Sequence, residues 1–174
     1  MGAGPIGLGT IIMAKLAGAK VISMDISTER LGIATNIARA DEAIDPTTEN
    51  VDEKLRELTN GNMPDVVIDA TGNRNAINEG FSYISHGGKY VLIGLQKEEI
   101  VMSQPEFHKR EATLMSSRNA TRQDFDEVIK AIRDKKIDVT SLITHRVPFK
   151  DVSEKFSSLL NPSNHVIKAM VEFE

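Results

Sequence analysis

The glycines at the start of the chain have the spacing of a phosphate-binding turn. Gly2, Gly4 and Gly7 form a G-x-G-x-x-G run, with Pro5 where a helix would begin. The first glycine allows a tight turn, the second lets a diphosphate approach the backbone, and the third lets the helix pack closely on a strand. The first helical turn offers N–H groups and a partial positive charge to the phosphates. The run therefore predicts a dinucleotide site at Gly2, Gly4, Pro5, Ile6 and Gly7.

An acidic residue follows this run at the spacing expected of a ribose ligand. Residues 20–25 have the apolar pattern of a short buried strand that ends on Asp25. A carboxylate about twenty residues after the glycines accepts hydrogen bonds from the adenosine ribose. It would repel a 2′-phosphate, so the pattern favours NAD over NADP. The alternative is that Asp25 caps the next helix, although Ser27 could supply that cap itself.

The remaining residues with catalytic potential form weaker patterns. No two of the four histidines have the i, i+4 spacing of ligands on a helix, and the sequence has no Cys. We therefore expect no metal site and no disulfide within this chain. Asp65 and Asp69 begin and end a predicted strand, so we do not expect them to act as a carboxylate pair.

Composition excludes several classes of protein. The chain has 174 residues, a net charge of −4 and 5% aromatic residues, which argues against a nucleic-acid partner. No apolar run approaches the roughly twenty residues of a membrane span. Residues 6–17 lack the basic flank and cleavage site of a signal peptide. Together with the absence of Cys, these features predict a cytoplasmic protein with no membrane partner.

Strands and helices alternate after the glycine run, which predicts a parallel sheet with helices on both faces. The expected strands are 20–25, 42–44, 65–69, 89–95, 99–103, 111–116 and 166–173, with 104–110 as a connection. The expected helices are 6–17, 28–38, 51–59, 76–84, 123–133 and 152–160. This is an α/β, Rossmann-type doubly wound sheet with a small C-terminal lobe. Its first strand would precede Gly2 at the sheet centre, and we expect that position to be filled rather than left as a gap.

The order of these motifs resembles the nucleotide-binding, C-terminal half of medium-chain, zinc-type alcohol and polyol dehydrogenases. The resemblance covers essentially the whole chain, and sorbitol-type and sugar-acid dehydrogenases are the most similar branch. It is carried by residues 2–8, 21–25, 29–31, 69–72, 87–94, 116–119, 142–149 and 167–171. It implies an NAD-binding domain over 1–135 and a segment, 136–174, that packs on a catalytic domain. That domain, which would hold the zinc, lies outside this sequence.

The resemblance also implies roles for single residues at the adenosine end of NAD. Asp25 would hold the ribose with Arg30 beside it, and Ile26 would lie against the adenine. Thr71 and Gly72 would line the same end of the cofactor.

At the nicotinamide end, the resemblance places Ile93, Gly94 and Leu95, whose backbone groups would fix the carboxamide. Arg118 would lie beside the nicotinamide, although an exposed position or one at the rim of a dimer is an open alternative. Residues Ile100–Ser103 would form an edge strand that pairs with a second copy, giving a homodimer or homotetramer.

One position departs from the family pattern. Arg39 stands where the family has a glycine, and a left-handed helix cap there would cost about 1 kcal/mol without one. We therefore expect the preceding helix to close differently.

These patterns together predict the NAD(H)-binding portion of a zinc-type dehydrogenase that oxidises an alcohol, a polyol or a sugar acid. We expect this portion to be inactive by itself. The alternative is a non-catalytic module that binds a dinucleotide or forms oligomers. A third interpretation is another Rossmann enzyme such as a methyltransferase, against which residues 93–94 and 144–149 argue.

Overall fold

The computed structural model describes residues 1–173, and its contacts divide the chain into two units, Met1–Ala120 and Thr121–Glu174. Each unit has a parallel sheet of its own. The boundary at Ala120 lies before the helix that the sequence analysis assigned to the first domain. The division into 1–135 and 136–174 stays a prediction.

Parallel strands form two ladders in the first unit. One ladder pairs β1 (Ile22–Met24) with β2 (Glu42–Ile44). The other has the order β3 (Val66–Asp69), β4 (Lys89–Leu92), β5 (Thr113–Ser116). All pairs run parallel, so the carboxyl ends of the strands within each ladder lie at one edge.

The first residues of the chain join the two ladders. The Gly2 N–H donates to the Met24 carbonyl at 2.7 Å, and the Ala70 N–H donates to the Met1 carbonyl at 2.9 Å. Met1 and Gly2 thus lie between the ends of β1 and β3, where a doubly wound sheet has its first strand. The Rossmann-type order predicted from the sequence is confirmed.

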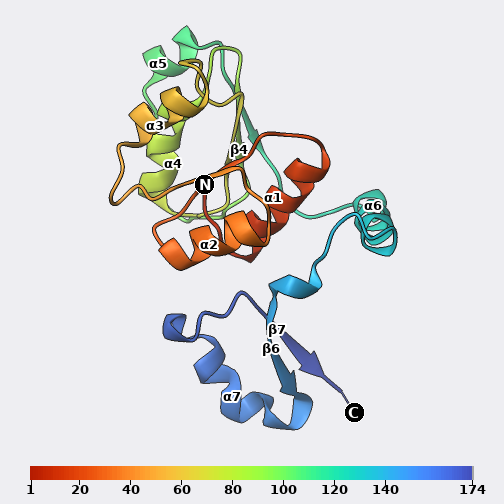
Figure 1. Ribbon diagram of the computed structural model, residues 1–174. Coiled ribbons are helices and arrows are strands. Elements are labelled where there is room, and N and C mark those ends of the chain that lie inside the picture. The colour runs from red at the N-terminus through yellow and green to blue at the C-terminus, as the bar shows by residue number, and fades with distance from the viewer. Residues whose placement is uncertain (174) are drawn as a thin grey trace. The chain divides into compact units, whose positions relative to one another are not determined.

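Helices lie on both faces of this sheet. Figure 1 shows α1 (Pro5–Leu16) on one side of β4, with α3 (Val51–Leu58) and α4 (Arg74–Gly80) on the other. The first unit also contains α2 (Thr28–Asn36) and α5 (Gln104–Lys109).

Local chemistry explains where these helices begin. Pro5 is the first residue of α1, where its missing N–H costs nothing. Ser27 caps α2, since its side chain accepts a hydrogen bond from the Arg30 N–H at 3.3 Å. Asn50 caps α3 in the same way, through the Glu53 N–H.

Two apolar clusters form the core of the first unit. One contains Val67, Ile77, Phe81, Ile84 and Tyr90, and the other contains Ile44, Val51, Leu55 and Met63. The buried Tyr90 hydroxyl donates to the Ile77 carbonyl at 3.0 Å, and burial raises the pKa of this phenol. This hydrogen bond ties β4 to the end of α4.

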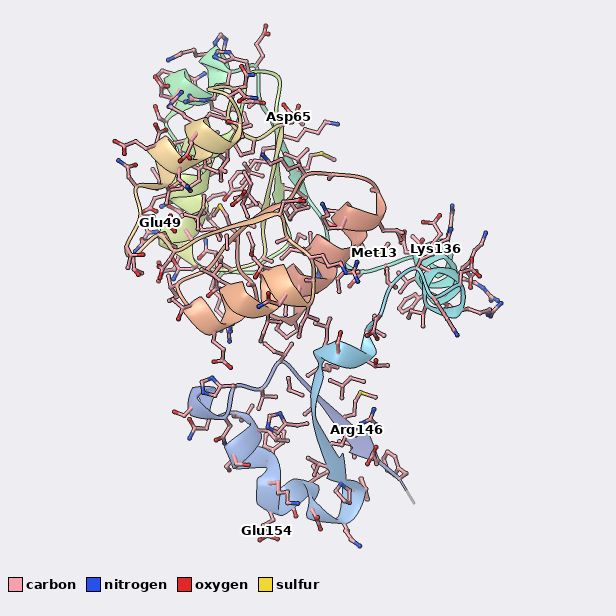
Figure 2. The ribbon with its side chains drawn as sticks, viewed as in Figure 1. Met13, Glu49, Asp65, Lys136, Arg146 and Glu154 are labelled. Carbon is pink, nitrogen blue, oxygen red and sulfur yellow. The ribbon has the colours of Figure 1, made fainter. Side chains whose placement is uncertain are left out.

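The second unit is a strand–helix–strand motif preceded by a helix. β6 (Ile143–Pro148) and β7 (Lys168–Glu172) are parallel, and α7 (Val152–Leu159) connects them. Arg146 of β6, labelled in Figure 2, pairs with Glu172 of β7, with 2.7 Å between Nη1 and Oε1. α6 (Arg122–Arg133) begins with a capping box between Thr121 and Asp124. Short 3-10 turns complete the chain, at Phe81–Tyr83 in the first unit and at Thr140–Leu142, Phe149–Asp151 and Pro162–Asn164 in the second.

Three predictions about local structure are wrong. The segment 99–103, expected as a strand, forms none within this chain, and its Val101 N–H donates to Asn78 Oδ1 at 2.8 Å; the pairing of Ile100–Ser103 with a second copy stays a prediction. Residues 104–110, expected as a connection, contain α5, because Pro105 fits the first turn of a helix. Arg39 itself adopts the left-handed conformation, with φ of 66°, which we did not expect of a residue with a side chain.

No helix within residues 1–173 is long and apolar enough to cross a bilayer.

Candidate functional site

The three glycines of the turn differ in what surrounds them. Gly2 has φ of +85°, and a Cβ there would lie 3.0 Å from the Thr71 nitrogen. A Cβ on Gly7 would overlap the carbonyl oxygen of Gly2. A Cβ on Gly4 would meet no protein atom within 4 Å, and φ of −73° at this residue suits any amino acid. Gly2 and Gly7 therefore hold the turn together, whereas Gly4 leaves open space above it.

The N-terminus of α1 has free donors. No side chain caps it, and the first intrahelical bond runs from the Leu8 N–H to the Gly4 carbonyl at 2.8 Å. Within the described residues, the N–H groups of Ile6 and Gly7 have no acceptor. Two donors at the positive end of a 12-residue helix are suited to an anion such as a diphosphate.

The carboxylate of Asp25 fastens the glycine turn to the end of β1. Its Oδ2 accepts from the Ala3 N–H at 2.6 Å, and its Oδ1 accepts from the Ser27 N–H at 2.9 Å. Each carboxylate oxygen has two lone pairs, so both oxygens still have room for a hydroxyl donor. Because Ser27 supplies the side-chain cap of α2, Asp25 is not that cap.

A cavity of about 470 Å³ opens between the glycine turn and α4. This volume lies in the range of small-molecule sites. Six of the predicted site residues line it: Gly2, Gly4, Asp25, Ile26, Arg30 and Thr71. The glycine turn, Asp25 after β1 and Thr71 after β3 therefore line the same cavity.

The sequence analysis missed the rest of the lining. The missed residues lie at the start of the chain, at the ends of β1, β2 and β3, or in and around α4: Met1, Met24, Pro46, Thr47, Ala70, Asn73, Asn75, Ala76, Glu79 and Tyr83. No motif marks them. The signal that could have found them is topological, because segments that follow parallel strands meet at one edge of a sheet.

The other predicted residues do not line this cavity. A Cβ on Gly94 would overlap the Gly72 nitrogen, and one on Gly72 would lie 2.8 Å from the Leu95 oxygen. The Ile93 and Gly94 N–H groups both donate to the Asp69 carbonyl at 2.9 Å. The loops after β3 and β4 are thus in close backbone contact. The remaining members of the predicted set outside the cavity are Pro5, Ile6, Gly7 and Arg118, and Arg118 is exposed after β5.

A buried carboxylate shapes the wall beside the turn. Asp69 is fully buried at the end of β3 and accepts hydrogen bonds from both the N–H and the hydroxyl of Thr71, the latter at 2.7 Å. The Thr71 hydroxyl accepts from the Asn73 N–H at 3.0 Å, and Asn73 caps α4. Asp69 therefore positions Thr71 and the start of α4. Asp65 lies at the other end of β3, so the two carboxylates form no pair (Figure 2).

The described residues do not form a metal site. No group of three His, Asp or Glu side chains among residues 1–173 is arranged to hold a metal ion, and the sequence has no Cys.

Known proteins share this architecture and sequence. L-galactonate-5-dehydrogenase of Escherichia coli (strain K12) is 41% identical over 174 residues, which cover 99% of this chain and 51% of that protein. L-idonate 5-dehydrogenase of Vitis vinifera is 32% identical, over 98% of this chain and 48% of that protein. An Escherichia coli CFT073 alcohol dehydrogenase, solved in complex with cofactor NADH, has a TM-score of 0.89 and 29% identity, over 99% of this chain and 50% of its own.

The chain spans about half the length of the curated relatives it matches. The sequence model of one family, described as zinc-binding dehydrogenase, matches residues 5–134. With the glycine turn, the parallel sheet and the relatives in agreement, this chain belongs to the zinc-binding dehydrogenase family.

Proposed function

We propose that this chain is the NAD(H)-binding part of a zinc-type dehydrogenase that oxidises an alcohol, a polyol or a sugar acid. The observation that carries the proposal is the cavity that brings the glycine turn and Asp25 together. The relative of known structure that was solved with NADH supports the choice of cofactor.

The residues present fit a dinucleotide. The open space above Gly4 and the free N–H groups of Ile6 and Gly7 suit the diphosphate. Asp25 offers acceptor positions to the ribose hydroxyls. Ile26, whose side chain is 73% exposed, offers an apolar surface to the adenine, and Arg30, Thr71 and Gly72 complete this end in our proposal.

We assign the nicotinamide end to Ile93, Gly94, Leu95 and Arg118. The close contact between the loops after β3 and β4 supports this assignment, since it leaves backbone groups of residues 93–95 at the carboxyl edge of the sheet. When bound here, NAD would supply the acceptor for a hydride from the substrate carbon. In this chain, the residues named would only orient the ring that receives it.

The substrate class follows from the relatives. Two of them are named for sugar acids, L-galactonate and L-idonate. We infer a hydroxylated substrate of this kind, a sugar acid or the related polyol.

The described residues do not fit the zinc of the family, so we derive no step through it. We place the zinc ligands outside these 174 residues, in a catalytic domain. Support comes from the relatives, which are about twice as long as this chain. We further propose that residues 136–174 pack on that domain, since this segment exposes six large apolar side chains: Phe149, Phe156, Leu160, Met170, Val171 and Phe173.

We also propose a cytoplasmic location and a homodimer or homotetramer. Exposed apolar side chains at Leu95, Val101 and Met102 support self-association of the first unit.

Cofactor choice tests the proposed function. The purified protein should bind NADH at least about tenfold more tightly than NADPH, because the Asp25 carboxylate repels a 2′-phosphate. Asp25→Asn should narrow this preference, whereas Asp134→Asn, an exposed acid at the end of α6, should leave it unchanged. Titrations followed by NADH fluorescence measure both. Equal or tighter NADPH binding by the unmodified protein would contradict the role given to Asp25.

A further inference from the structure

One side of α4 lines part of the cavity. Asn75, Ala76 and Glu79 are spaced so that they share that side, and Tyr83 lies beyond the helix end. The opposite side of α4 is packed in the core through Ile77 and Gly80. The side chains of Asn75 and Glu79 are therefore held by a helix rather than by a mobile loop.

The lining of the cavity combines apolar surface with polar groups. Met24, Ile26, Pro46 and Ala76 supply apolar surface, and Asn75 and Glu79 supply an amide and a carboxylate. A purine base has two flat apolar faces and a rim of hydrogen-bonding atoms. The lining matches that chemistry.

The two polar groups are available to a ligand. Within the described part of the chain, neither the Glu79 carboxylate nor the Asn75 side-chain amide has a hydrogen-bond partner. The neighbouring Thr hydroxyls are not free to donate to a ligand. The Thr47 hydroxyl donates to Asp45 Oδ1 at 2.6 Å, and the Thr71 hydroxyl donates to Asp69. Their protons are already used within the protein.

We propose that Glu79 reads the amino edge of the adenine, so that the site selects adenine dinucleotides against hypoxanthine dinucleotides. This inference rests on the proposed function. A carboxylate only accepts hydrogen bonds, and adenine presents a donating amine where hypoxanthine presents an accepting oxygen. The Asn75 amide can either accept or donate a hydrogen bond, so it can pair with both bases. The difference in affinity between adenine and hypoxanthine is therefore assigned to Glu79.

The test compares NADH with reduced nicotinamide hypoxanthine dinucleotide, which differ only at the purine. The unmodified protein should bind NADH about tenfold more tightly, the effect of one hydrogen bond to a charged group at a partly open site. Glu79→Gln should remove most of this preference, because its amide can donate to the hypoxanthine oxygen. Glu53→Gln, an exposed acid on α3 outside the cavity, should retain it.

The outcomes separate the two proposals. Equal affinity of the unmodified protein for both dinucleotides, or an unchanged preference in Glu79→Gln, would overturn the role of Glu79 and leave the proposed function standing. Failure of both dinucleotides to bind would overturn the role of Glu79 and the proposed function together. Circular dichroism of each variant checks that it is folded.

Discussion

Glycine positions in the first unit differ in what surrounds them. Gly7 and Gly94 are in contact with backbone, and Gly80 with the hydroxyl of Tyr90. At these three positions, a methyl group must displace part of the protein. Gly4 and Gly9 face open space, so a methyl group there disturbs nothing that belongs to the chain. Only at Gly4 and Gly9 can a loss of ligand binding in an alanine variant be assigned to a clash with the ligand rather than to a change in the protein.

The contact between Gly80 and Tyr90 gives a prediction about the core. Gly80→Ala should lower the free energy of unfolding by about 2 kcal/mol, because the new Cβ would overlap the Tyr90 hydroxyl. Tyr90→Phe should cost about 1–2 kcal/mol through the loss of the buried hydrogen bond to the Ile77 carbonyl. Since Tyr90→Phe removes the overlapping oxygen, the double variant should be more stable than the sum of both losses by about 1 kcal/mol. Urea denaturation of the four proteins measures this coupling, and strict additivity would contradict the packing described.

The sequence predicted only part of the site at this scale. The roles of Gly2 and Gly7 follow from a motif with a fixed geometry, and the structure bears them out as packing constraints. Asn75 and Glu79 could not be predicted, because nothing in their local sequence distinguishes them from other exposed polar residues. They reach the cavity only because α4 follows β3 at the same edge of the sheet as the glycine turn.

Helices and strands with a strong apolar pattern were predictable, and short ones near proline were not. Residues 66–69 and 89–92 are apolar strands bounded by turns, and both are present. The pattern of Ile100, Val101 and Met102 also indicated a strand, yet only Ile100 packs on the core, and the other two are exposed. Without a neighbouring strand in this chain, three apolar residues are too few to fix an extended segment.

The end of α2 gives a prediction about an element. Arg39 has φ of 66°, which is strained for a residue with a Cβ. Arg39→Gly should therefore raise the free energy of unfolding by about 0.5–1 kcal/mol, the strain relieved minus the entropy that glycine adds to the unfolded chain.

Arg39→Ala is the matched control, because it removes the same charge and keeps the strain. It should not raise stability. Thermal unfolding of the three proteins measures the difference. Equal midpoints for Arg39→Gly and Arg39→Ala would contradict the view that the backbone conformation is the cause.

For the whole molecule, the fold class was predictable because the order of motifs fixes a parallel topology. The turn, the acid after β1 and the glycines after β3 and β4 occur in one sequence order that a doubly wound sheet explains. The boundary between units was not predictable, since no change of composition marks Ala120. Neither the sequence nor the fold identifies the substrate, because the described cavity contacts only the cofactor in our proposal.

The central claim is that the glycine turn receives the diphosphate of NAD, and Gly4→Ala tests it most directly. Gly4 caps α1 with its backbone alone, so the substitution should change stability by less than about 1 kcal/mol. It should weaken NADH binding at least about tenfold, because the new methyl group occupies the space through which the diphosphate reaches the backbone.

Gly9→Ala is the matched control, in the same helix and also facing open space. It should raise stability by about 0.5–1 kcal/mol and leave NADH binding unchanged. NADH titrations of the unmodified protein and both variants, monitored by fluorescence, give the comparison. We expect tight binding by the unmodified protein and Gly9→Ala and weak binding by Gly4→Ala. Equal NADH affinity in all three proteins would contradict the placement of the diphosphate on this turn.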